Sequence, residues 1–92
     1  MKLTDAEIAE RLERLKNWSR EGDEIRRTFK LRSFPDAIGF VTRVGFLAES
    51  AGHHPDIDIR YKRVTLALTT HDAGGLTEKD FALAAQIDGV LP

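Results

Sequence analysis

The strongest constraint on the fold comes from residues 57–69, where apolar and polar side chains alternate almost without interruption. The apolar positions are Ile57, Ile59, Tyr61, Val64, Leu66 and Leu68. A period of two places successive side chains on opposite faces of a strand, so the stretch predicts two half-buried strands joined as a hairpin. Residues 60–63 contain neither glycine nor asparagine, so the sequence leaves the turn type open.

A second alternating stretch, residues 24–31, predicts another half-buried strand. Arg27 interrupts its apolar face. The preceding Glu21-Gly22-Asp23 is typical of a turn, and the residues around 18–20 are expected to form a short partner strand. The chain therefore carries two predicted hairpins.

Helical spacing of apolar residues predicts helices at 5–16, at 34–51 and after Thr77. Thr4-Asp-Ala-Glu7 and Thr77-Glu-Lys-Asp80 have the spacing of a capping box. In that motif the threonine oxygen and the acidic side chain bind exposed amides of the first turn. The first and last helices therefore have well-defined starts.

The central predicted helix has a wide apolar arc. At about 100° per residue, its apolar face collects Phe34, Ala37, Ile38, Val41, Val44, Ala48 and Ala51, with Phe40 and Leu47 beside them. Phe46 falls on the otherwise polar side. Because this arc exceeds what one sheet covers, we expect the helix to pack against a second subunit as well, in a homodimer or homotetramer. Gly52 is expected to end the helix.

The predicted order is helix, strand, strand, helix, strand, strand, helix. Antiparallel hairpins whose apolar faces need covering predict an α+β fold. We expect a two-layer α-β-β-α-β-β-α arrangement, in which three helices cover one face of a four-stranded antiparallel sheet. Residues 1–92 contain no repeat or linker, so a single domain is expected.

Composition limits the classes of function. The 92 residues include no cysteine, which excludes disulfides and thiolate metal sites. Fourteen basic residues against fifteen acidic ones give a net charge of −1, which does not favour nucleic acid as a partner. No apolar run suggests a signal peptide or membrane span, so we expect no membrane association and a cytoplasmic location.

All three histidines fall within residues 53–71, with acidic side chains close by in the sequence. The histidines are His53, His54 and His71, and the acidic neighbours are Glu49, Asp56 and Asp72. The unperturbed pKa of histidine, about 6.5, is close to neutral, so this grouping is typical of a site that transfers protons. One imidazole can donate a proton while another accepts one, which is general acid–base catalysis.

Two other interpretations of the histidines stay open. Imidazole also binds metals, but adjacent residues such as His53 and His54 point apart in extended backbone, and no His-x-His or His-x-x-x-His spacing occurs. We therefore expect no metal site. A purely structural role, in which the rings cap helix ends or fill gaps, is the other alternative.

The chain resembles the pterin-4a-carbinolamine dehydratases over almost its whole length. The matching motifs are His53-His54-Pro55-Asp56, Tyr61, Thr70-His71 and Gly75-Leu76-Thr77-Glu78-Lys79-Asp80, with Trp18, Phe29, Phe34 and Gly39–Val44 upstream. The resemblance implies the α+β fold above and assembly into dimers or tetramers. It also implies dehydration of 4a-hydroxytetrahydrobiopterin to quinonoid dihydrobiopterin without metal or cofactor, which recycles the pterin of aromatic amino acid hydroxylases.

The resemblance also implies a set of site residues. His53, His54 and His71 would be catalytic, one helping the hydroxyl to leave and another accepting a ring-nitrogen proton. The implied substrate-binding residues are Glu49, Pro55, Asp56, Thr70, Asp80 and Trp18. Lys79 and Asp80 match a polar pair at the start of the last helix, and Trp18 has a role in the core as its alternative.

The chain departs from the family pattern at three positions. Gly52 stands where many members have an acidic residue, Ile57 where they have an aromatic one, and Lys62 where asparagine is common. Two other functions therefore remain as alternatives. One is a binding, assembly or transcriptional-coactivator-like protein on the same fold, and the other is a dehydratase for a different pterin.

Overall fold

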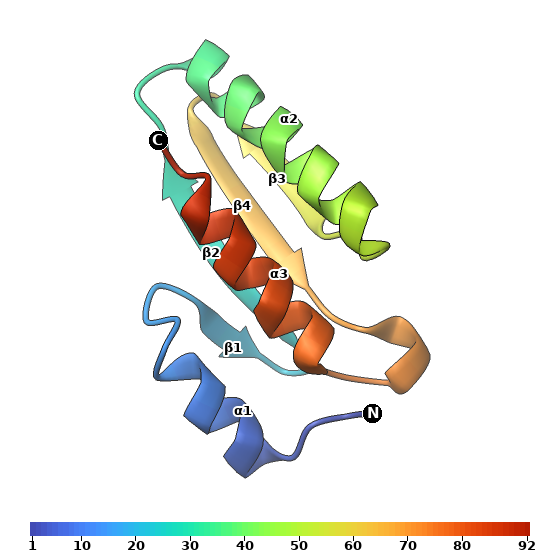
Figure 1. The fold of residues 1–92 in the computed structure, drawn as a ribbon. Helices are drawn as coiled ribbons and strands as arrows, with labels where there is room; N and C mark the ends of the chain where they lie inside the picture. Colours follow the sequence, from blue (N-terminus) through green and yellow to red (C-terminus); the bar gives the residue numbers. More distant parts are fainter.

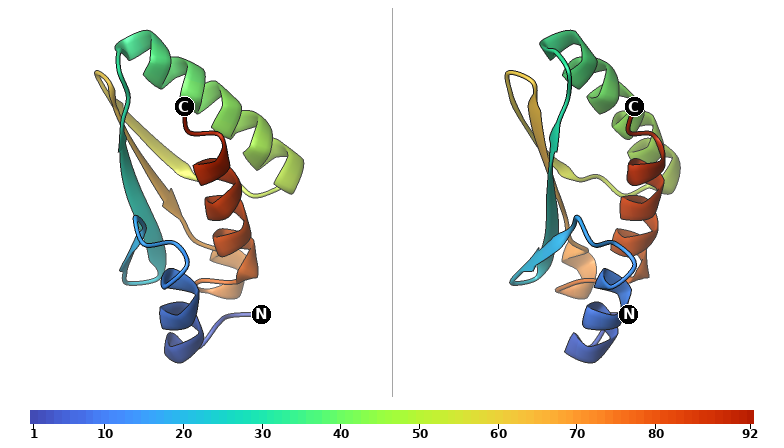
Figure 2. Two further views of the ribbon diagram at one scale, coloured as in Figure 1. Left: turned by 60° about the vertical axis from the view of Figure 1, so that its left-hand side comes forward. Right: turned by 90° about the vertical axis from the view of Figure 1, so that its left-hand side faces the viewer.

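The computed structural model describes residues 1–92 as two layers, a sheet and a set of helices (Figure 1). The strands are β1 (Ser19–Glu21), β2 (Glu24–Lys30), β3 (Asp56–Arg60) and β4 (Arg63–Leu68). The helices are α1 (Asp5–Leu12), α2 (Phe34–Ala51) and α3 (Glu78–Gly89), with a short 3-10 turn, η1 (His71–Ala73). The sheet is antiparallel in the order β1-β2-β4-β3. Figure 2 shows the three helices on one face of it, as predicted.

The predicted hairpin of β3 and β4 is confirmed. Ile57 pairs with Leu66 and Ile59 with Val64, so these side chains share the face that the helices cover. Tyr61 turns the chain with a φ of 55°. Glycine or asparagine usually occupies such a left-handed position, and this is why the sequence did not reveal the turn.

The charged interruption of β2 has a partner on α3. Arg27 lies on the covered face between Ile25 and Phe29, and its Nη1 donates a hydrogen bond of 2.7 Å to Oδ1 of Asp88. The Arg27 guanidinium carbon lies 4.3 Å from the centroid of the Phe29 ring. The charge is therefore compensated, and it does not break the strand.

Helix α2 begins at the N-cap Ser33 and ends at Gly52, whose φ of 62° is left-handed. Its buried residues are Ala37, Phe40, Val44 and Ala48. Phe34, Ile38 and Ala51, which belong to the predicted apolar face, are exposed in the single chain. Phe40 packs against Phe29, with ring centroids 4.8 Å apart, so the helix turns the Phe40 side of its apolar arc toward the sheet.

Helix α1 ends at Leu12, earlier than the predicted residue 16. Beyond it, the amides of Glu13, Arg14 and Leu15 each donate to the carbonyl three residues earlier, which tightens the chain into a turn before β1. Both predicted capping boxes are present, at Thr4 and at Thr77. None of the helices has the length and apolar character needed to cross a bilayer.

Candidate active site

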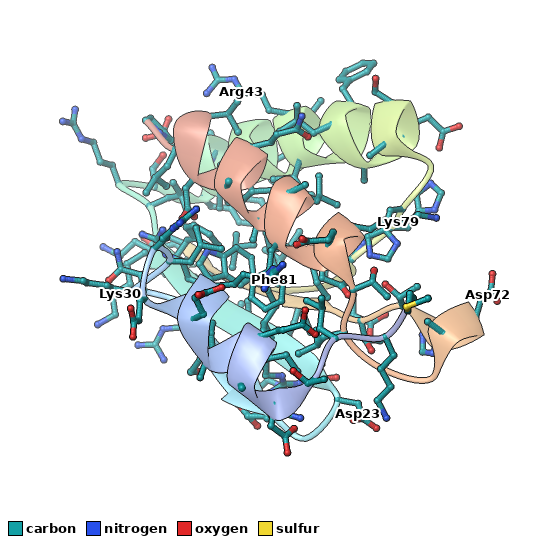
Figure 3. The ribbon with its side chains drawn as sticks, turned by 60° about the horizontal axis from the view of Figure 1, so that its bottom comes forward. Asp23, Lys30, Arg43, Asp72, Lys79 and Phe81 are labelled. Atoms are coloured by element: carbon teal, nitrogen blue, oxygen red, sulfur yellow. The ribbon has the colours of Figure 1, made fainter.

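The fold brings the three histidines to one end of the sheet. His53 and His54 follow the left-handed Gly52 at the end of α2, and His71 begins η1 just after β4. Together they line a cavity of about 290 Å³. Its other lining residues are Gly52, Thr69, Thr70, Asp72 and Lys79. In Figure 3, Lys79 and Asp72 lie at the same end of the molecule.

His53 is held by a fully buried carboxylate. Its Nε2 lies 2.6 Å from Oδ1 of Asp80, and the two side chains are 11% and 0% exposed. The other oxygen of Asp80, Oδ2, accepts hydrogen bonds from the Thr77 amide at 2.9 Å and from the Thr70 hydroxyl at 2.8 Å. Both oxygens therefore have partners, as burial of a carboxylate requires.

The contact with Asp80 bears on which nitrogen of His53 carries the proton. An ionised Asp80 only accepts hydrogen bonds, so its contact with Nε2 favours the tautomer of His53 that carries the proton on Nε2. In the neutral ring, Nδ1 is then left with a free lone pair. The same Asp80 closes the capping box of α3, so the start of that helix positions the carboxylate and the carboxylate orients the imidazole.

His54 has a looser environment. Its Nε2 lies 2.9 Å from Oε1 of Glu49, but the two side chains are 65% and 82% exposed. An exposed pair of this kind contributes at most about 1 kcal/mol to stability. His71 is also exposed. The cavity thus combines one anchored imidazole with two accessible ones.

Two of the residues implied by the resemblance lie elsewhere. Asp56 begins β3 and pairs with Ala67, which places it on the uncovered face of the sheet, where it lines a separate hollow of about 260 Å³. Trp18 is only 3% exposed, and its Nε1 donates to Asp88 at 2.9 Å. Asp88 follows Asp80 by eight residues, or about 12 Å along α3. Trp18 therefore occupies the core, the alternative that the sequence left open.

The remaining implied residues lie in or beside the site. Thr70 and Asp80 belong to the network around His53, Glu49 pairs with His54, and the half-buried Pro55 follows the two histidines. Sequence reasoning treated Thr77 only as a helix cap, but its Oγ1 also lies 2.8 Å from Oγ1 of Thr70. The capping-box spacing was the signal that located it.

The geometry supports proton transfer more directly than metal binding. No group of three or more histidine, aspartate or glutamate side chains converges in a way that could hold a metal ion. His53 and His54 have separate carboxylate partners, one buried and one exposed. Unequal environments of this kind are what divide acid from base in catalytic pairs.

The fold and the cavity define a small α+β domain with an imidazole-lined site, and comparisons with known proteins identify its family. The family model for pterin 4 alpha carbinolamine dehydratase matches residues 1–90, and the chain belongs to this family. A protein of Roseiflexus sp. (strain RS-1), named "Putative pterin-4-alpha-carbinolamine dehydratase", is 68% identical over 98% of this chain and 97% of its own length. A protein of Chloroflexus aurantiacus with the same name is 70% identical over the same shares.

Two solved structures are similar to this chain. A structure titled as a transcriptional coactivator/pterin dehydratase from Brucella melitensis has a TM-score of 0.95 and 33% identity, and covers 100% of both chains. A pterin dehydratase-like protein, described in its title as a RuBisCO assembly factor in the alpha-carboxysome, has a TM-score of 0.64 and 23% identity. That match covers 78% of this chain and 83% of the other, and it shows a shared fold alone.

Proposed function

We propose that the protein dehydrates 4a-hydroxytetrahydrobiopterin to quinonoid dihydrobiopterin by general acid–base catalysis. The observation that carries this proposal is the convergence of His53, His54 and His71 on one cavity, with His53 anchored to the buried Asp80. Membership of the family supports the reaction class. In this role the protein would act in the cytoplasm and recycle the pterin that an aromatic amino acid hydroxylase uses.

The reaction needs one proton delivered and one removed. The bond between C4a and the hydroxyl oxygen breaks, and the hydroxyl leaves as water with a proton from an imidazolium. The neighbouring ring nitrogen loses its proton to a neutral imidazole, and its electron pair forms the new double bond to C4a. Each such proton transfer typically accelerates a reaction by about 10²–10⁴-fold.

The hydrogen-bond network favours His53 as the base. Because Asp80 holds the proton of His53 on Nε2, the neutral ring offers Nδ1 as the acceptor. The imidazolium that forms is then stabilised by the buried carboxylate. His54 and His71 are exposed and free of such a buried partner, which suits the delivery of a proton to the leaving hydroxyl.

A stopped-flow assay tests this function. The 4a-hydroxy pterin is generated with an aromatic amino acid hydroxylase, and its dehydration is followed with the wild type and with His54→Ala. His54 is 65% exposed, so the substitution leaves the fold intact. We expect wild-type acceleration that His54→Ala loses and that Lys62→Ala, at the distant hairpin tip, retains. No acceleration by the wild type, or an unchanged rate in His54→Ala, would contradict the proposal.

The exposed apolar residues of α2 favour a second role for that helix, as a contact surface. Phe34, Ile38 and Phe46 are 47%, 40% and 74% exposed. We propose that they pack against another copy of this chain in a dimer or tetramer. The competing explanation is that a different protein covers them, as in the binding and assembly alternative. Light scattering should give a multiple of the 10.3 kDa chain mass that Phe46→Ser lowers, whereas a monomeric wild type would contradict self-association.

A further inference from the structure

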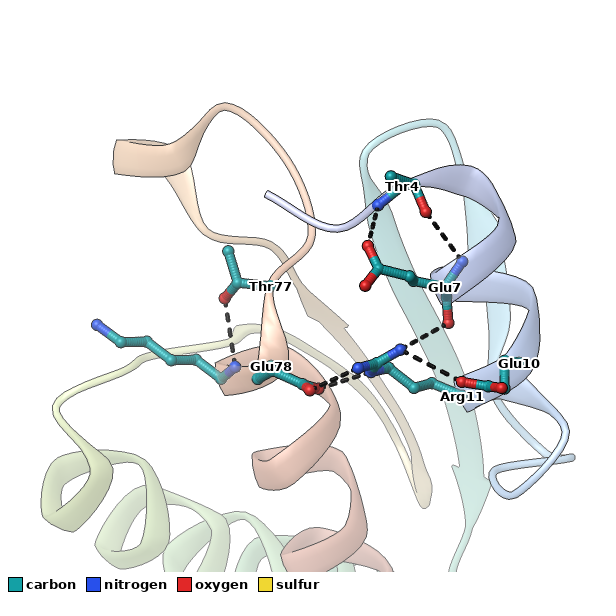
Figure 4. Close-up of polar contacts among 7 residues, drawn as sticks. Thr4, Glu7, Glu10, Arg11, Thr77 and Glu78 are labelled. Atoms are coloured by element: carbon teal, nitrogen blue, oxygen red, sulfur yellow. Dashed lines mark hydrogen bonds and ion pairs between the residues drawn. The ribbon is translucent and has the colours of Figure 1, made fainter. Parts of the chain in front are cut away.

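The N-cap residues of α1 and α3 perform the same task in different surroundings. Thr4 and Thr77 each close a capping box, in which the hydroxyl oxygen accepts a hydrogen bond from the first turn of the helix (Figure 4). Thr4 is exposed, whereas Thr77 is only 5% exposed and has a second contact, because its Oγ1 lies 2.8 Å from Oγ1 of Thr70. A helix cap does not require this second contact.

Thr70 links the cap of α3 to the candidate active site. Its amide donates to the Gly75 carbonyl at 3.1 Å, and its carbonyl accepts from the Gly75 amide at 3.3 Å, which closes the loop that contains η1. Oγ1 of Thr70 lies 2.8 Å from Oγ1 of Thr77 and also 2.8 Å from Oδ2 of Asp80. Thr70 lines the three-histidine cavity and Thr77 does not, so Thr77 reaches the cavity only through other residues.

The direction of these hydrogen bonds follows from the number of protons available. An ionised Asp80 only accepts, so the single hydroxyl proton of Thr70 points at Oδ2 of Asp80. The contact between the two hydroxyls then takes its proton from Thr77. Thr77 can supply it, because its oxygen accepts from the amide of Lys79 and its own proton is free. The hydroxyls therefore donate in one direction, from Thr77 to Thr70 to Asp80.

Thr77 supports Asp80 in two ways. Its backbone amide donates directly to Oδ2 at 2.9 Å, and its hydroxyl acts on the same oxygen through Thr70. Hydrogen bonds in a chain strengthen one another inside a protein, because a hydroxyl that accepts a hydrogen bond becomes a better donor. Asp80 is fully buried, so the orientation of its carboxylate depends on these donors and on His53.

We infer that Thr77 is a positioning residue of the active site. Its hydroxyl directs the proton of Thr70 onto Asp80, and Asp80 is thereby held as the acceptor for Nε2 of His53. The inference rests on the proposed function, in which the other nitrogen of His53 takes the proton of the substrate. Thr77 does not line the cavity, so it acts only through Thr70 and Asp80.

Nitrogen-15 NMR of the His53 ring, recorded without substrate, tests this role. The measurement is made at about pH 9, well above the ordinary imidazole pKa of about 6.5, so that the ring shifts report which nitrogen carries the proton. The His53 signals are identified by their absence in His53→Gln. We expect Nε2 to carry the proton in the wild type.

Three substitutions of Thr77 separate the hydroxyl from the helix cap. Thr77→Ser keeps both, Thr77→Val loses both, and Thr77→Gly lacks the hydroxyl but keeps most of the stability of the cap, because glycine is tolerated at an N-cap. We expect the His53 signals of Thr77→Ser to match the wild type, and those of Thr77→Gly and Thr77→Val to shift toward a mixture of tautomers. Thr4→Val, which loses a cap outside the network, should leave the signals unchanged.

Stopped-flow dehydration provides a second readout, under conditions where circular dichroism shows each variant folded. We expect kcat to fall by about two- to tenfold in Thr77→Gly and Thr77→Val, the range that one neutral hydrogen bond provides. KM should stay unchanged, because Thr77 does not line the cavity that the pterin is proposed to occupy. Thr77→Ser should retain the wild-type kcat.

Wild-type signals and a wild-type kcat in Thr77→Gly would overturn the inference, and so would a wild-type His53 that carries its proton on Nδ1. Changes that appear in Thr77→Val but not in Thr77→Gly would assign the effect to the helix cap, which also overturns it. The NMR signals are recorded without substrate, so a failure of the proposed function is distinguishable. A wild type that does not dehydrate the pterin overturns that function, while the signals still decide whether Thr77 positions His53.

Discussion

The two ends of α3 each present an aspartate to partners from distant parts of the chain, with different consequences. Near the start of the helix, Asp80 faces His53, an imidazole that lines a cavity. Near its end, Asp88 binds the indole of Trp18 and the guanidinium of Arg27, two groups that only donate hydrogen bonds. The same residue type on one helix therefore binds an imidazole at a cavity at one end and joins packed side chains at the other, and we propose that only the first takes part in proton transfer.

Replacing the partner of Asp80 should have the largest effect. His53→Gln retains an amide donor for the carboxylate but has no group that accepts or releases a proton. We expect the dehydration rate constant to fall by about 10²–10⁴-fold, as measured by stopped-flow absorbance. Trp18→Phe removes the corresponding donor to Asp88 and should leave the rate unchanged. Equal loss of rate in both variants would remove the distinction between the two ends of the helix.

Removing the other carboxylate should affect stability and leave the chemistry intact. Asp88→Asn removes the negative charge opposite the partly buried Arg27 and places an amide nitrogen where one of the two oxygens now accepts from Trp18. We expect unfolding free energy to drop by about 1–3 kcal/mol, seen as a lower urea midpoint by circular dichroism. The dehydration rate of Asp88→Asn is measured under conditions where the variant is folded. A rate that falls together with the urea midpoint would contradict a purely structural role for Asp88.

A third carboxylate on α3, that of the exposed Glu78, tests how much an exposed ion pair contributes to stability. The hydrogen bond from Arg11 lowers the pKa of Glu78 from its ordinary value of 4.5. Such a group stabilises the fold above its unfolded pKa, and this contribution disappears as the pH falls through the lowered folded value. The stability of Glu78→Gln should therefore be slightly below that of the wild type near neutral pH and converge with it below 4.5. If the stability curves of the wild type and Glu78→Gln stay parallel as the pH falls, the ionised Glu78 contributes nothing to stability.

Local features of the fold could be predicted from the sequence. Alternation located the hairpin of β3 and β4, and threonine–acid spacing located the starts of α1 and α3. Each of these signals lies within a few residues of the structure that it specifies, so the sequence alone contains it. The turn at Tyr61 is the local exception, because a left-handed tyrosine has no sequence signature.

Contacts between distant residues could not be predicted in the same way. In the sequence, Arg27 only interrupts the apolar face of a strand. Its partner, Asp88, lies 61 residues later, and the structure alone shows their contact. The spacing of Asp80 predicted a helix cap, but its contact with His53, 27 residues earlier, depends on how α2 and α3 pack. The three histidines line one cavity because the β3–β4 hairpin returns the chain to the end of α2, which is a property of the topology.

The central claim is that Asp80 gives His53 its function while Asp88 serves the fold, and the dehydration rate of a matched pair of variants tests it most directly. Stopped-flow rates are measured for the wild type, Asp80→Asn and Asp88→Asn at a temperature where circular dichroism shows all three folded. We predict a wild-type rate for Asp88→Asn and a loss of about 10²-fold or more for Asp80→Asn. A wild-type rate for Asp80→Asn, or the same loss in both variants, would contradict the claim.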